Sequence, residues 1–447
     1  MRRGRARSET VTETTSTARE DGTRRVVEFS PPDITRAEID EVVDALESGW
    51  ITTGPKTKRL EAELARFTGA ARMVCLSSAT AALECALRAL GIGPGDEVIT
   101  SAYTYTASAS PICHVGATPV LADVAPGSYE MDCDALAARI TPRTRAIIPV
   151  DIAGRLCDYG RLRAVAESTR SGFRPANERQ EALGRIAIVA DGAHALGATQ
   201  RGAHAGQLAD LTTFSFHAVK NLTTAEGGAL AWREGVFDDE ALYRDVMLMS
   251  LHGQTKDALA KTKAGAWEYD IAFPGWKCNM TDIQAALGLA QLRRYPGLLA
   301  RRRALVARYE DGLADLPVEL LRHYEDAAGG SAAHADDAAV RAAQDGCSSS
   351  GHLMLVRMPG KSEAFRNALI ERLAEAGVAA NVHYKPLPLL SAYRNLGFSI
   401  EDFPCALAQF QNEVTLPLHT KLSDADVDYV VARFHDAYRA LEAEGVA

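Results

Sequence analysis

The sequence predicts an α/β fold: a mostly parallel seven-stranded sheet in a large domain, followed by a smaller α+β domain at the C-terminal end. Short apolar runs alternate with amphipathic helical patterns between residues 73 and 232, an order typical of a parallel sheet covered by helices on both faces. A second block with its own helices and strands follows from residue 281. The 447 residues, 47% of them hydrophobic, are enough for a large core and more than one domain.

Seven apolar runs are the strand candidates of the first block. They are residues 73–77, 97–100, 118–124, 145–151, 186–197, 211–217 and 227–232. Amphipathic segments at 79–90 and 134–140 lie between the early runs. Ligands bind beyond the carboxyl ends of parallel strands, so polar residues directly after these runs are the first candidates for a functional site.

The second block is predicted to contain four helices and two strands. The helices are 281–295, 296–316, 362–377 and a C-terminal helix after Ser423, and the strands are 352–358 and 379–386. We therefore expect a large domain of residues 27–295 and a small domain of residues 296–447. The stretches 168–184 and 325–351 have a low-complexity composition, which predicts mobile surface loops. Residues 1–26 are expected to be a disordered tail, with a basic interaction arm as the alternative.

The composition excludes several classes of protein. The net charge of −9 provides no overall field that would attract nucleic acid. No run of eighteen apolar residues exists, and no apolar segment follows the arginines at the N-terminus, so we expect neither a membrane span nor an export signal. The eight cysteines form no CxxC pair, which favours reduced thiols in a cytoplasmic protein and predicts no metal site.

Lys220 is the first candidate for chemistry. It stands in "TTFSFHAVKNLTTAEGG", between the end of an apolar strand and a small polar loop. A lysine at such a position is costly to bury as a cation, so it either meets a carboxylate or becomes neutral and nucleophilic. Neutral lysine forms Schiff bases with carbonyl compounds. The alternative is a surface lysine that caps a helix.

Several other side chains at strand ends fit the same chemistry. Asp191 ends an apolar strand, where a carboxylate could pair with a pyridinium nitrogen or cap a helix. Ser78 and Thr80 stand directly before a helix, whose free N–H groups favour a phosphate, and Ser215 could add a hydroxyl group. Tyr105 follows another strand end and could stack on a flat cofactor or pack in the core.

Together these residues resemble the DegT/DnrJ/EryC1/StrS family of sugar aminotransferases, which have the fold-type-I aspartate-aminotransferase-like architecture and use pyridoxal 5'-phosphate. The resemblance extends from about Val27 to the C-terminal helix. The matching segments are "SGWITTGPKTKRLE", "SSATAAL", "GDEVITSAYTYTASA", "GATPVLADV", "DGAHALGA", "SFHAVKNLTTAEGG", "PGWKCNMTDIQAALGLAQL" and "NVHYKPL". The forms "WITTGPK" and "SSATAA" are most similar to the enzymes that aminate UDP-linked 4-keto-arabinose.

The resemblance assigns a role to each candidate. Lys220 would hold the cofactor and move the proton during transamination, and Asp191 would pair with the pyridine nitrogen. The other cofactor contacts implied are His194 at the phenolic oxygen, Tyr105 on the ring, Ser78, Ala79 (through its N–H), Thr80 and Ser215 at the phosphate, and Asn279 across a dimer interface. Further candidates for substrate contact are Thr53, Lys277, His352, His383 and Tyr384.

The implied reaction is a ping-pong transfer from L-glutamate, which leaves as 2-oxoglutarate, through pyridoxamine 5'-phosphate to a nucleotide-linked keto sugar. A 4-keto sugar, UDP- or dTDP-linked, is the first choice, and a homodimer with shared active sites is expected. The alternatives are amination of a 3-keto sugar, a cyclitol or an aminobenzoate precursor, and a non-catalytic homologue. A pyridoxamine-dependent sugar dehydratase is disfavoured by Lys220, because those relatives carry histidine at this position.

Overall fold

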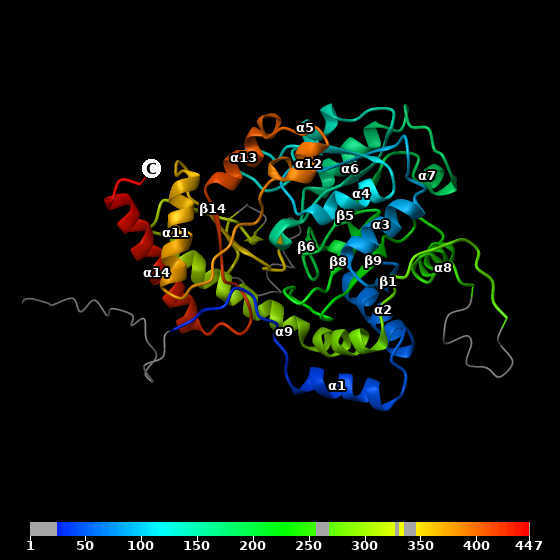
Figure 1. Cartoon of the computed structure of the whole chain (residues 1–447), viewed down its shortest axis with the longest axis horizontal. Coiled ribbons are helices and arrows are strands. Elements are labelled where there is room, and N and C mark those ends of the chain that lie inside the picture. The colour runs from blue at the N-terminus through cyan, green and yellow to red at the C-terminus, as the bar shows by residue number, and fades with distance from the viewer. Residues whose placement is uncertain (1–24, 256–267, 327–329, 335–345, 447) are drawn as a thin grey trace, which may run out of the picture.

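The computed structural model describes residues 25–255, 268–326, 330–334 and 346–446 (Figure 1). The predicted tail up to residue 24, and residues 327–329 and 335–345 of the predicted insert at 325–351, therefore lie outside the described residues. The α-helices are α1 Arg36–Glu47, α2 Pro55–Thr68, α3 Ala79–Ala89, α4 Ser110–His114, α5 Cys133–Ala138, α6 Tyr159–Ser168, α7 Glu178–Leu183, α8 Asp239–Ser250, α9 Asp282–Leu313, α11 Glu363–Glu375, α12 Ser391–Asn395, α13 Pro404–Gln411 and α14 Asp424–Ala443. The strands of the large sheet are β1 Arg72–Leu76, β2 Glu97–Ser101, β3 Thr118–Ala122, β4 Thr144–Ile148, β5 Ala187–Asp191, β8 Leu211–Ser215 and β9 Gly228–Trp232.

The large sheet confirms the predicted fold class. Its strand order is β1-β9-β8-β5-β4-β2-β3. The pairs among β3, β2, β4, β5 and β8 are parallel, and β9 runs antiparallel to both of its neighbours. Each of the seven predicted apolar runs overlaps one of these strands. The run at 186–197 is shorter than predicted as a strand, because β5 ends at Asp191 and a turn follows.

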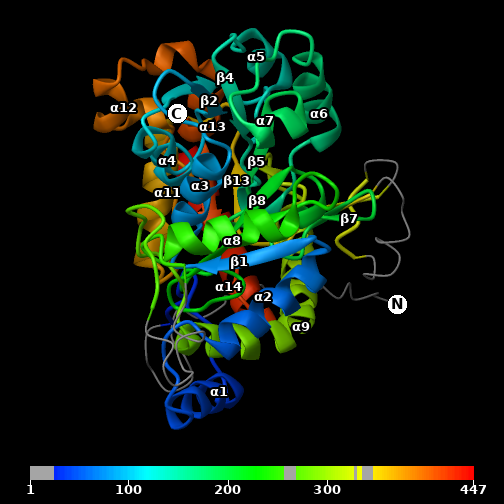
Figure 2. The ribbon, with the colours of Figure 1, turned by 90° about the vertical axis from the view of Figure 1, so that its right-hand side faces the viewer.

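Helices cover both faces of the sheet, and the strands divide their side chains between two cores. Ile99, Ile147 and Phe214 pack with residues of α2, α6 and α9, whereas Val98 and Ile148 pack on the other face with residues of α3 and α8. Alternate residues of a strand point to opposite faces, so both cores require the nearly continuous apolar runs seen in the sequence. Figure 2 shows α8 and α3 on one side of the sheet, with α2 and α9 beneath.

A second core lies around the three-stranded sheet β10-β13-β14, whose strands are β10 Glu319–Leu320, β13 Met354–Arg357 and β14 Glu413–Leu416. Residues of α11, α14 and the C-terminal half of α9 complete it. The predicted strand at 379–386 is wrong, because only Asn381 forms a bridge, to Thr415, and the following backbone turns away to other partners. The small sheet β11-β12-β6-β7 comprises β11 Tyr324–Glu325, β12 Cys347–Ser348, β6 Thr199–Gln200 and β7 Ala203–His204.

Helix α9 continues where two helices were predicted. Pro296 lies inside it, although proline usually kinks or ends a helix because it lacks an N–H group. Packing on both sides of this point outweighs the local cost: Tyr295 donates to the Leu196 carbonyl at 2.8 Å, and α1 lies along α9 (Figures 1 and 2). The predicted domain boundary at residue 295 therefore falls within one continuous helix.

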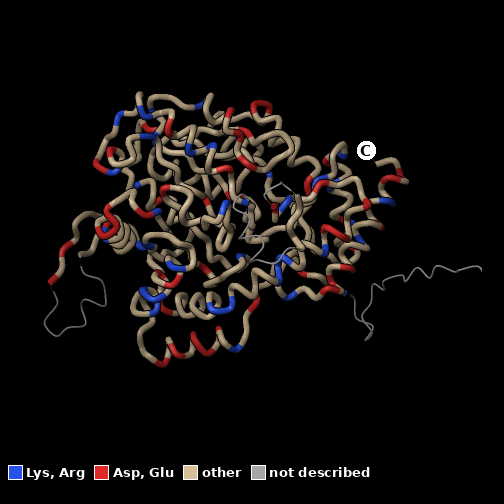
Figure 3. The backbone as a smooth tube through the Cα atoms, turned by 180° about the vertical axis from the view of Figure 1, so that it is seen from behind, with Lys and Arg blue, Asp and Glu red and all other residues tan. Residues whose placement is uncertain are grey.

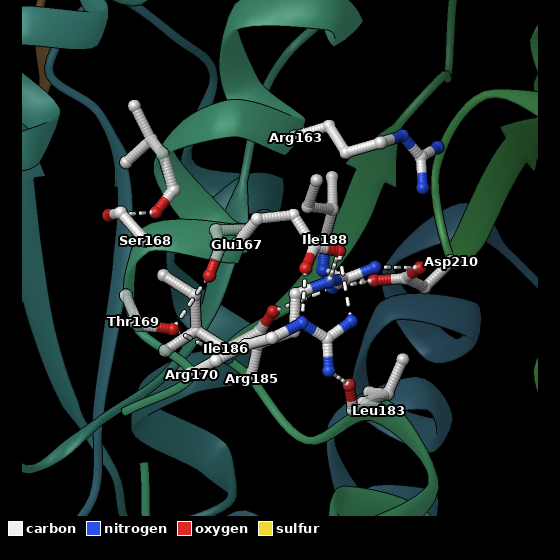
Figure 4. Close-up of polar contacts among 12 residues, drawn as sticks. Arg163, Glu167, Ser168, Thr169, Arg170, Leu183, Arg185, Ile186, Ile188 and Asp210 are labelled. Carbon is white, nitrogen blue, oxygen red and sulfur yellow. Dashed lines mark hydrogen bonds and ion pairs between the residues drawn. The ribbon is translucent and has the colours of Figure 1, made fainter. Parts of the chain in front are cut away.

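The stretch 168–184 is not the mobile surface loop that its composition predicts. It contains α7, capped by the Asn177 side chain, which accepts from two backbone N–H groups, and Phe173 is buried. Arg170 reaches back to the Leu183 carbonyl, and directly after the stretch Arg185 forms a bidentate pair with the fully buried Asp210 at 2.7 and 2.8 Å (Figure 4). These polar contacts hold the segment in place, although its low apolar content predicts mobility.

In the described part of the chain, Lys and Arg are interspersed with Asp and Glu along the backbone in the view of Figure 3. Arg25, predicted to belong to the disordered tail, is instead held by Asp426 at 2.7 Å and lies over the Tyr429 ring. In the described part of the chain, no helix is both long and apolar enough to cross a membrane.

Candidate active site

A cavity of about 380 Å³ opens at the carboxyl ends of the central strands, where a parallel sheet is expected to bind its ligand. Nine of the sequence-predicted residues line it: Ser78, Ala79, Thr80, Tyr105, Asp191, His194, Ser215, Lys220 and Tyr384. They come from four separate strand ends and from the segment after α11. The structure therefore brings most of the predicted cofactor contacts together in one place.

Lys220 lies in the turn that follows β8, where its backbone N–H donates to the His217 carbonyl. Burial lowers the pKa of its amino group to about 8, and the nearby Asp191 carboxylate acts in the opposite direction. At pH 7.5 a pKa of about 8 leaves roughly a quarter of the amine neutral, compared with about a thousandth at the ordinary value. Lys220 is thus prepared to act as a nucleophile and as a base.

Asp191 ends β5 at the floor of the cavity and is 6% exposed. Burial raises the pKa of its carboxyl group, while hydrogen bonds from the Ser108 hydroxyl at 2.6 Å and the Ala193 N–H at 3.2 Å favour the ionised form. Thr104 is hydrogen-bonded to Ser108 at 2.7 Å. Sequence reasoning missed Ser108, because nothing in the serine-rich stretch after β2 distinguishes the serine that faces Asp191.

The beginning of α3 and the strand end at Ser215 form a cradle for an anion. Ser78 caps the helix by accepting from the Ala81 N–H at 3.0 Å, and the N–H groups of the first turn have no partner within the helix. A Cβ atom on Gly228 would lie 2.3 Å from the Ala79 nitrogen, so only glycine lets β9 pass this close to the helix start. Helix N-termini of this kind bind phosphate.

His194 contacts the cavity with a fixed tautomer. Its Nδ1 accepts from the Ala153 N–H at 3.1 Å, and its Nε2 lies 3.2 Å from the Tyr384 hydroxyl. Burial and the charge of Lys220 hold the pKa of His194 well below its usual value. The ring is therefore neutral, with its proton on Nε2, which faces the Tyr384 hydroxyl on the side of the cavity.

Tyr105 is 60% exposed at the edge of the cavity, which contradicts the alternative that it packs in the core. Its ring is tilted toward that of Tyr384, with centroids 5.9 Å apart. This leaves one face free to stack on a flat ligand. The cavity is also lined by His217 and Glu226, which sequence reasoning did not select. The His217 Nε2 lies 3.6 Å from the Glu226 Oε1.

His352 does not line the cavity, contrary to its selection as a substrate contact. It is buried behind His194, with ring centroids 4.3 Å apart, and its Nδ1 is 2.9 Å from the Asn221 amide oxygen. The Asn221 amide also donates to the Ser350 carbonyl. The end of the predicted insert is thereby fixed beneath the site, so the expected mobile loop does not extend through residues 346–351.

Thr53, Lys277 and Asn279 form a separate cluster outside the cavity. The Asn279 amide donates to the Thr53 hydroxyl at 2.5 Å, and Lys277 contacts the Asn279 amide oxygen. Thr53 is buried and donates to the Met280 carbonyl at 2.5 Å. Within one chain, this arrangement does not bring the three residues to the ligand cavity.

Comparison with known proteins agrees with this geometry. The family model described as DegT/DnrJ/EryC1/StrS aminotransferase family matches residues 32–435. The chain is 36% identical over 418 residues to the spore coat polysaccharide biosynthesis protein SpsC of Bacillus subtilis, covering 93% of this chain and 97% of that protein.

Solved structures give the same answer. The putative sugar aminotransferase Spr1654 from Streptococcus pneumoniae in its PMP form superposes with a TM-score of 0.86 at 54% identity, over 93% of this chain and 100% of that one, and a PLP form of the same protein also matches. A 3-amino-5-hydroxybenzoic acid synthase matches with a TM-score of 0.76 at 28% identity, over 93% and 100% of the two chains. The chain therefore belongs to the DegT/DnrJ/EryC1/StrS aminotransferase family and is a pyridoxal-phosphate-dependent sugar aminotransferase.

Proposed function

We propose that this enzyme transfers the amino group of L-glutamate to a nucleotide-linked keto sugar, with a 4-keto sugar as the first choice. The observation that carries the proposal is the pairing of Lys220, whose pKa is lowered to about 8, with the buried Asp191 in one cavity. The sugar aminotransferases among the relatives support a sugar as the amino acceptor.

The residues of the cavity fit pyridoxal 5'-phosphate. Its phosphate would match the α3 N-terminus with Ser78, Thr80 and Ser215, where Gly228 lets β9 pass close to the Ala79 nitrogen. Asp191 would face the pyridine nitrogen and Lys220 would hold the cofactor covalently. When bound, the cofactor withdraws electrons from the reacting carbon of the substrate.

The side chains around the cofactor would divide the remaining work. Lys220 would take a proton at Nζ from the substrate carbon that carries the amino group and hold it for delivery during the transfer. Asp191 would be ionised beside the protonated ring nitrogen of the cofactor and would keep the proton there. His194 would orient the cofactor ring through Nε2, while Tyr105 would cover one face of the ring and reduce access of water.

A homodimer is part of this proposal. Among the cavity-lining residues of the described chain, Lys220 is the one Lys or Arg side chain, so the carboxylates of glutamate need cations from elsewhere. Lys277 is exposed, and the apolar side chains of Ile51, Ile271 and Trp276 are 40–50% exposed. Such side chains mark an interface. We propose that a second copy covers them and receives Lys277 and Asn279 at its own cavity.

We also propose the division into a large domain of residues 27–295 that binds the cofactor and a small domain of residues 296–447. The separate cores on either side of α9 support it. Tyr384 would bring the small domain to the cavity.

A direct test loads the protein with the cofactor, adds L-glutamate, removes the free amino acid and then offers UDP- and dTDP-linked 4-keto and 3-keto sugars in turn. Release of 2-oxoglutarate followed by mass-spectrometric detection of one amino sugar would establish donor and acceptor. A protein that releases 2-oxoglutarate and aminates none of the sugars would contradict the proposed acceptor.

The second candidate is amination of a non-nucleotide ring, such as a cyclitol or an aminobenzoate precursor. The similarity to a 3-amino-5-hydroxybenzoic acid synthase over 93% of the chain favours including it. The same assay separates the two, because inhibition of the amination by free UDP or dTDP is expected only for a nucleotide-linked acceptor.

A further inference from the structure

Glu413 is a buried carboxyl group close to the active site that the reaction outlined above does not use. It is 0% exposed and begins β14. Its Oε1 accepts from the Thr415 hydroxyl at 2.5 Å, and its Oε2 accepts from the His383 backbone N–H at 3.0 Å. Both oxygens are therefore committed to residues that lead toward His383, not to a neighbouring basic side chain.

Thr415 connects this carboxyl group with the imidazole ring of His383. Residues 413 and 415 share one face of β14, and the Thr415 Oγ1 lies 3.0 Å from the His383 Nδ1. The backbones of Thr415 and Asn381 are also joined by two hydrogen bonds, of 2.7 and 3.0 Å. The result is a continuous row of hydrogen bonds from Glu413 through Thr415 to His383.

The row of hydrogen bonds from Glu413 through Thr415 holds the His383 imidazole ring at Nδ1, whether Glu413 is ionised or protonated. Burial raises the pKa of Glu413 to about 8, against the opposing effects of Thr415, His383 and the charge of Arg366. When the carboxylate is ionised, Thr415 donates to it and accepts from Nδ1–H, which leaves a lone pair on Nε2. When it is protonated, the donors reverse and Nε2 carries the proton.

His383 does not itself line the cavity, but its ring lies beside that of Tyr384, which does, with centroids 4.8 Å apart. The His383 ring stacks on Phe29 at 5.5 Å, with 12° between the planes, and the Tyr103 hydroxyl donates to the His383 carbonyl at 2.8 Å. Burial and the charge of Lys220 lower its pKa to about 4, so the ring is neutral near pH 7. Among the residues that the structure describes, none forms a hydrogen bond with its Nε2.

We propose that Glu413 and Thr415 are positioning residues that hold Nε2 of His383 beside the cavity, next to Tyr384, where it binds a hydroxyl group of the sugar substrate. A hydroxyl group both donates and accepts, so it pairs with Nε2 in either state of the row, whereas a keto oxygen pairs only with the protonated nitrogen. The inference rests on the proposed function, because it needs a sugar as the amino acceptor.

The test compares Thr415→Val, which removes the hydroxyl group but keeps the shape, with Thr415→Ser, which restores it. The matched control is Thr100→Val: Thr100 is also fully buried in a strand, but its hydroxyl group donates only to the Ile148 carbonyl. Binding of UDP-glucose and dTDP-glucose, which carry no keto group and do not react, is measured on the cofactor-loaded enzyme by isothermal titration calorimetry. The glutamate and keto-sugar half-reactions are measured separately.

Losing one oriented hydrogen bond to the ligand is expected to raise the Kd of the hexose and the KM of the keto sugar about fivefold to tenfold in Thr415→Val. The kcat/KM of the glutamate half-reaction should stay within about twofold, since His383 binds the sugar. Thr415→Ser and Thr100→Val should match the wild type in sugar binding. In a His383→Ala background, Thr415→Val should have no further effect on the Kd.

The contrary results are distinct. If the wild type binds and aminates sugars but Thr415→Val does so equally well, the positioning role is overturned and the proposed function stands. Equal losses in both half-reactions, or a full further loss in the His383→Ala background, would mean that Thr415 acts only on the general structure. A wild type that neither binds nor aminates any nucleotide sugar removes the proposed function, and this inference with it.

Discussion

Replacing Ser108 by alanine is expected to weaken cofactor binding without disturbing the fold. Asp191 has two hydrogen-bond donors, and the Ser108 hydroxyl at 2.6 Å is closer than the Ala193 N–H at 3.2 Å. A hydrogen bond to a charged group contributes about 1.5–3 kcal/mol, and both Ser108 and Asp191 are buried, so water does not replace it. The pKa of Asp191, already raised by burial, should rise further and reduce the fraction that can pair with a pyridinium nitrogen.

This loss corresponds to an increase of about tenfold to a hundredfold in the Kd of pyridoxal 5'-phosphate. The assay is a titration of the cofactor-free protein, followed by the visible absorbance of the bound cofactor. Ser101→Ala is the matched control, since Ser101 is equally buried but its hydroxyl contacts only the Tyr103 backbone. If Ser108→Ala bound the cofactor as tightly as the control, Ser108 would have no part in tuning Asp191.

Lys220→Ala should abolish turnover of L-glutamate to 2-oxoglutarate, and retention of full activity would remove its catalytic role. The neutral amine of Lys220 is the reactive form, and its pKa is lowered to about 8. The rate at which the protein binds the cofactor covalently should therefore rise with pH and level off above about pH 8. A stopped-flow profile that stays flat from pH 6.5 to 9 would contradict this. Asp210→Ala leaves Arg185 buried without its bidentate partner and should lower the free energy of unfolding in urea by about 3–5 kcal/mol. Asp134→Ala, which removes the exposed pair with Arg161, should leave it nearly unchanged; equal effects of the two would refute the importance of burial.

The large sheet could be predicted because each of its strands is apolar on both faces. Strand β14 could not, since Glu413 and Thr415 interrupt the apolar run and form hydrogen bonds with His383. Pro296 predicted a helix end, but α9 packs on both cores and continues through it. The local sequence therefore predicted the helices and strands whose burial follows from apolar composition. It failed where tertiary contacts outweigh the local preference of the residues.

The candidate site divides in the same way. Lys220 and Asp191 stand at strand ends, so their position follows from the strands themselves. Ser108 and Asn221 act through partners 83 and 131 residues away in the chain, and no local pattern predicts such pairs. Ala153 has a φ of 57°, an unusual conformation for a residue other than glycine, and its N–H fixes the tautomer of His194.

The segment that begins at residue 346 shows why amino-acid composition is a poor guide to local order near this site. Low apolar content predicts mobility because such a segment cannot bury enough surface to offset its loss of conformational entropy. Residues 349–352 meet this cost with hydrogen bonds: Ser349 N–H donates to the His323 carbonyl, Asn221 donates to the Ser350 carbonyl, and the buried Arg302 donates to the Gly351 carbonyl, all within 3.0 Å. Since Asn221 directly follows Lys220, the order of this segment and the position of the reactive amine depend on the same contacts.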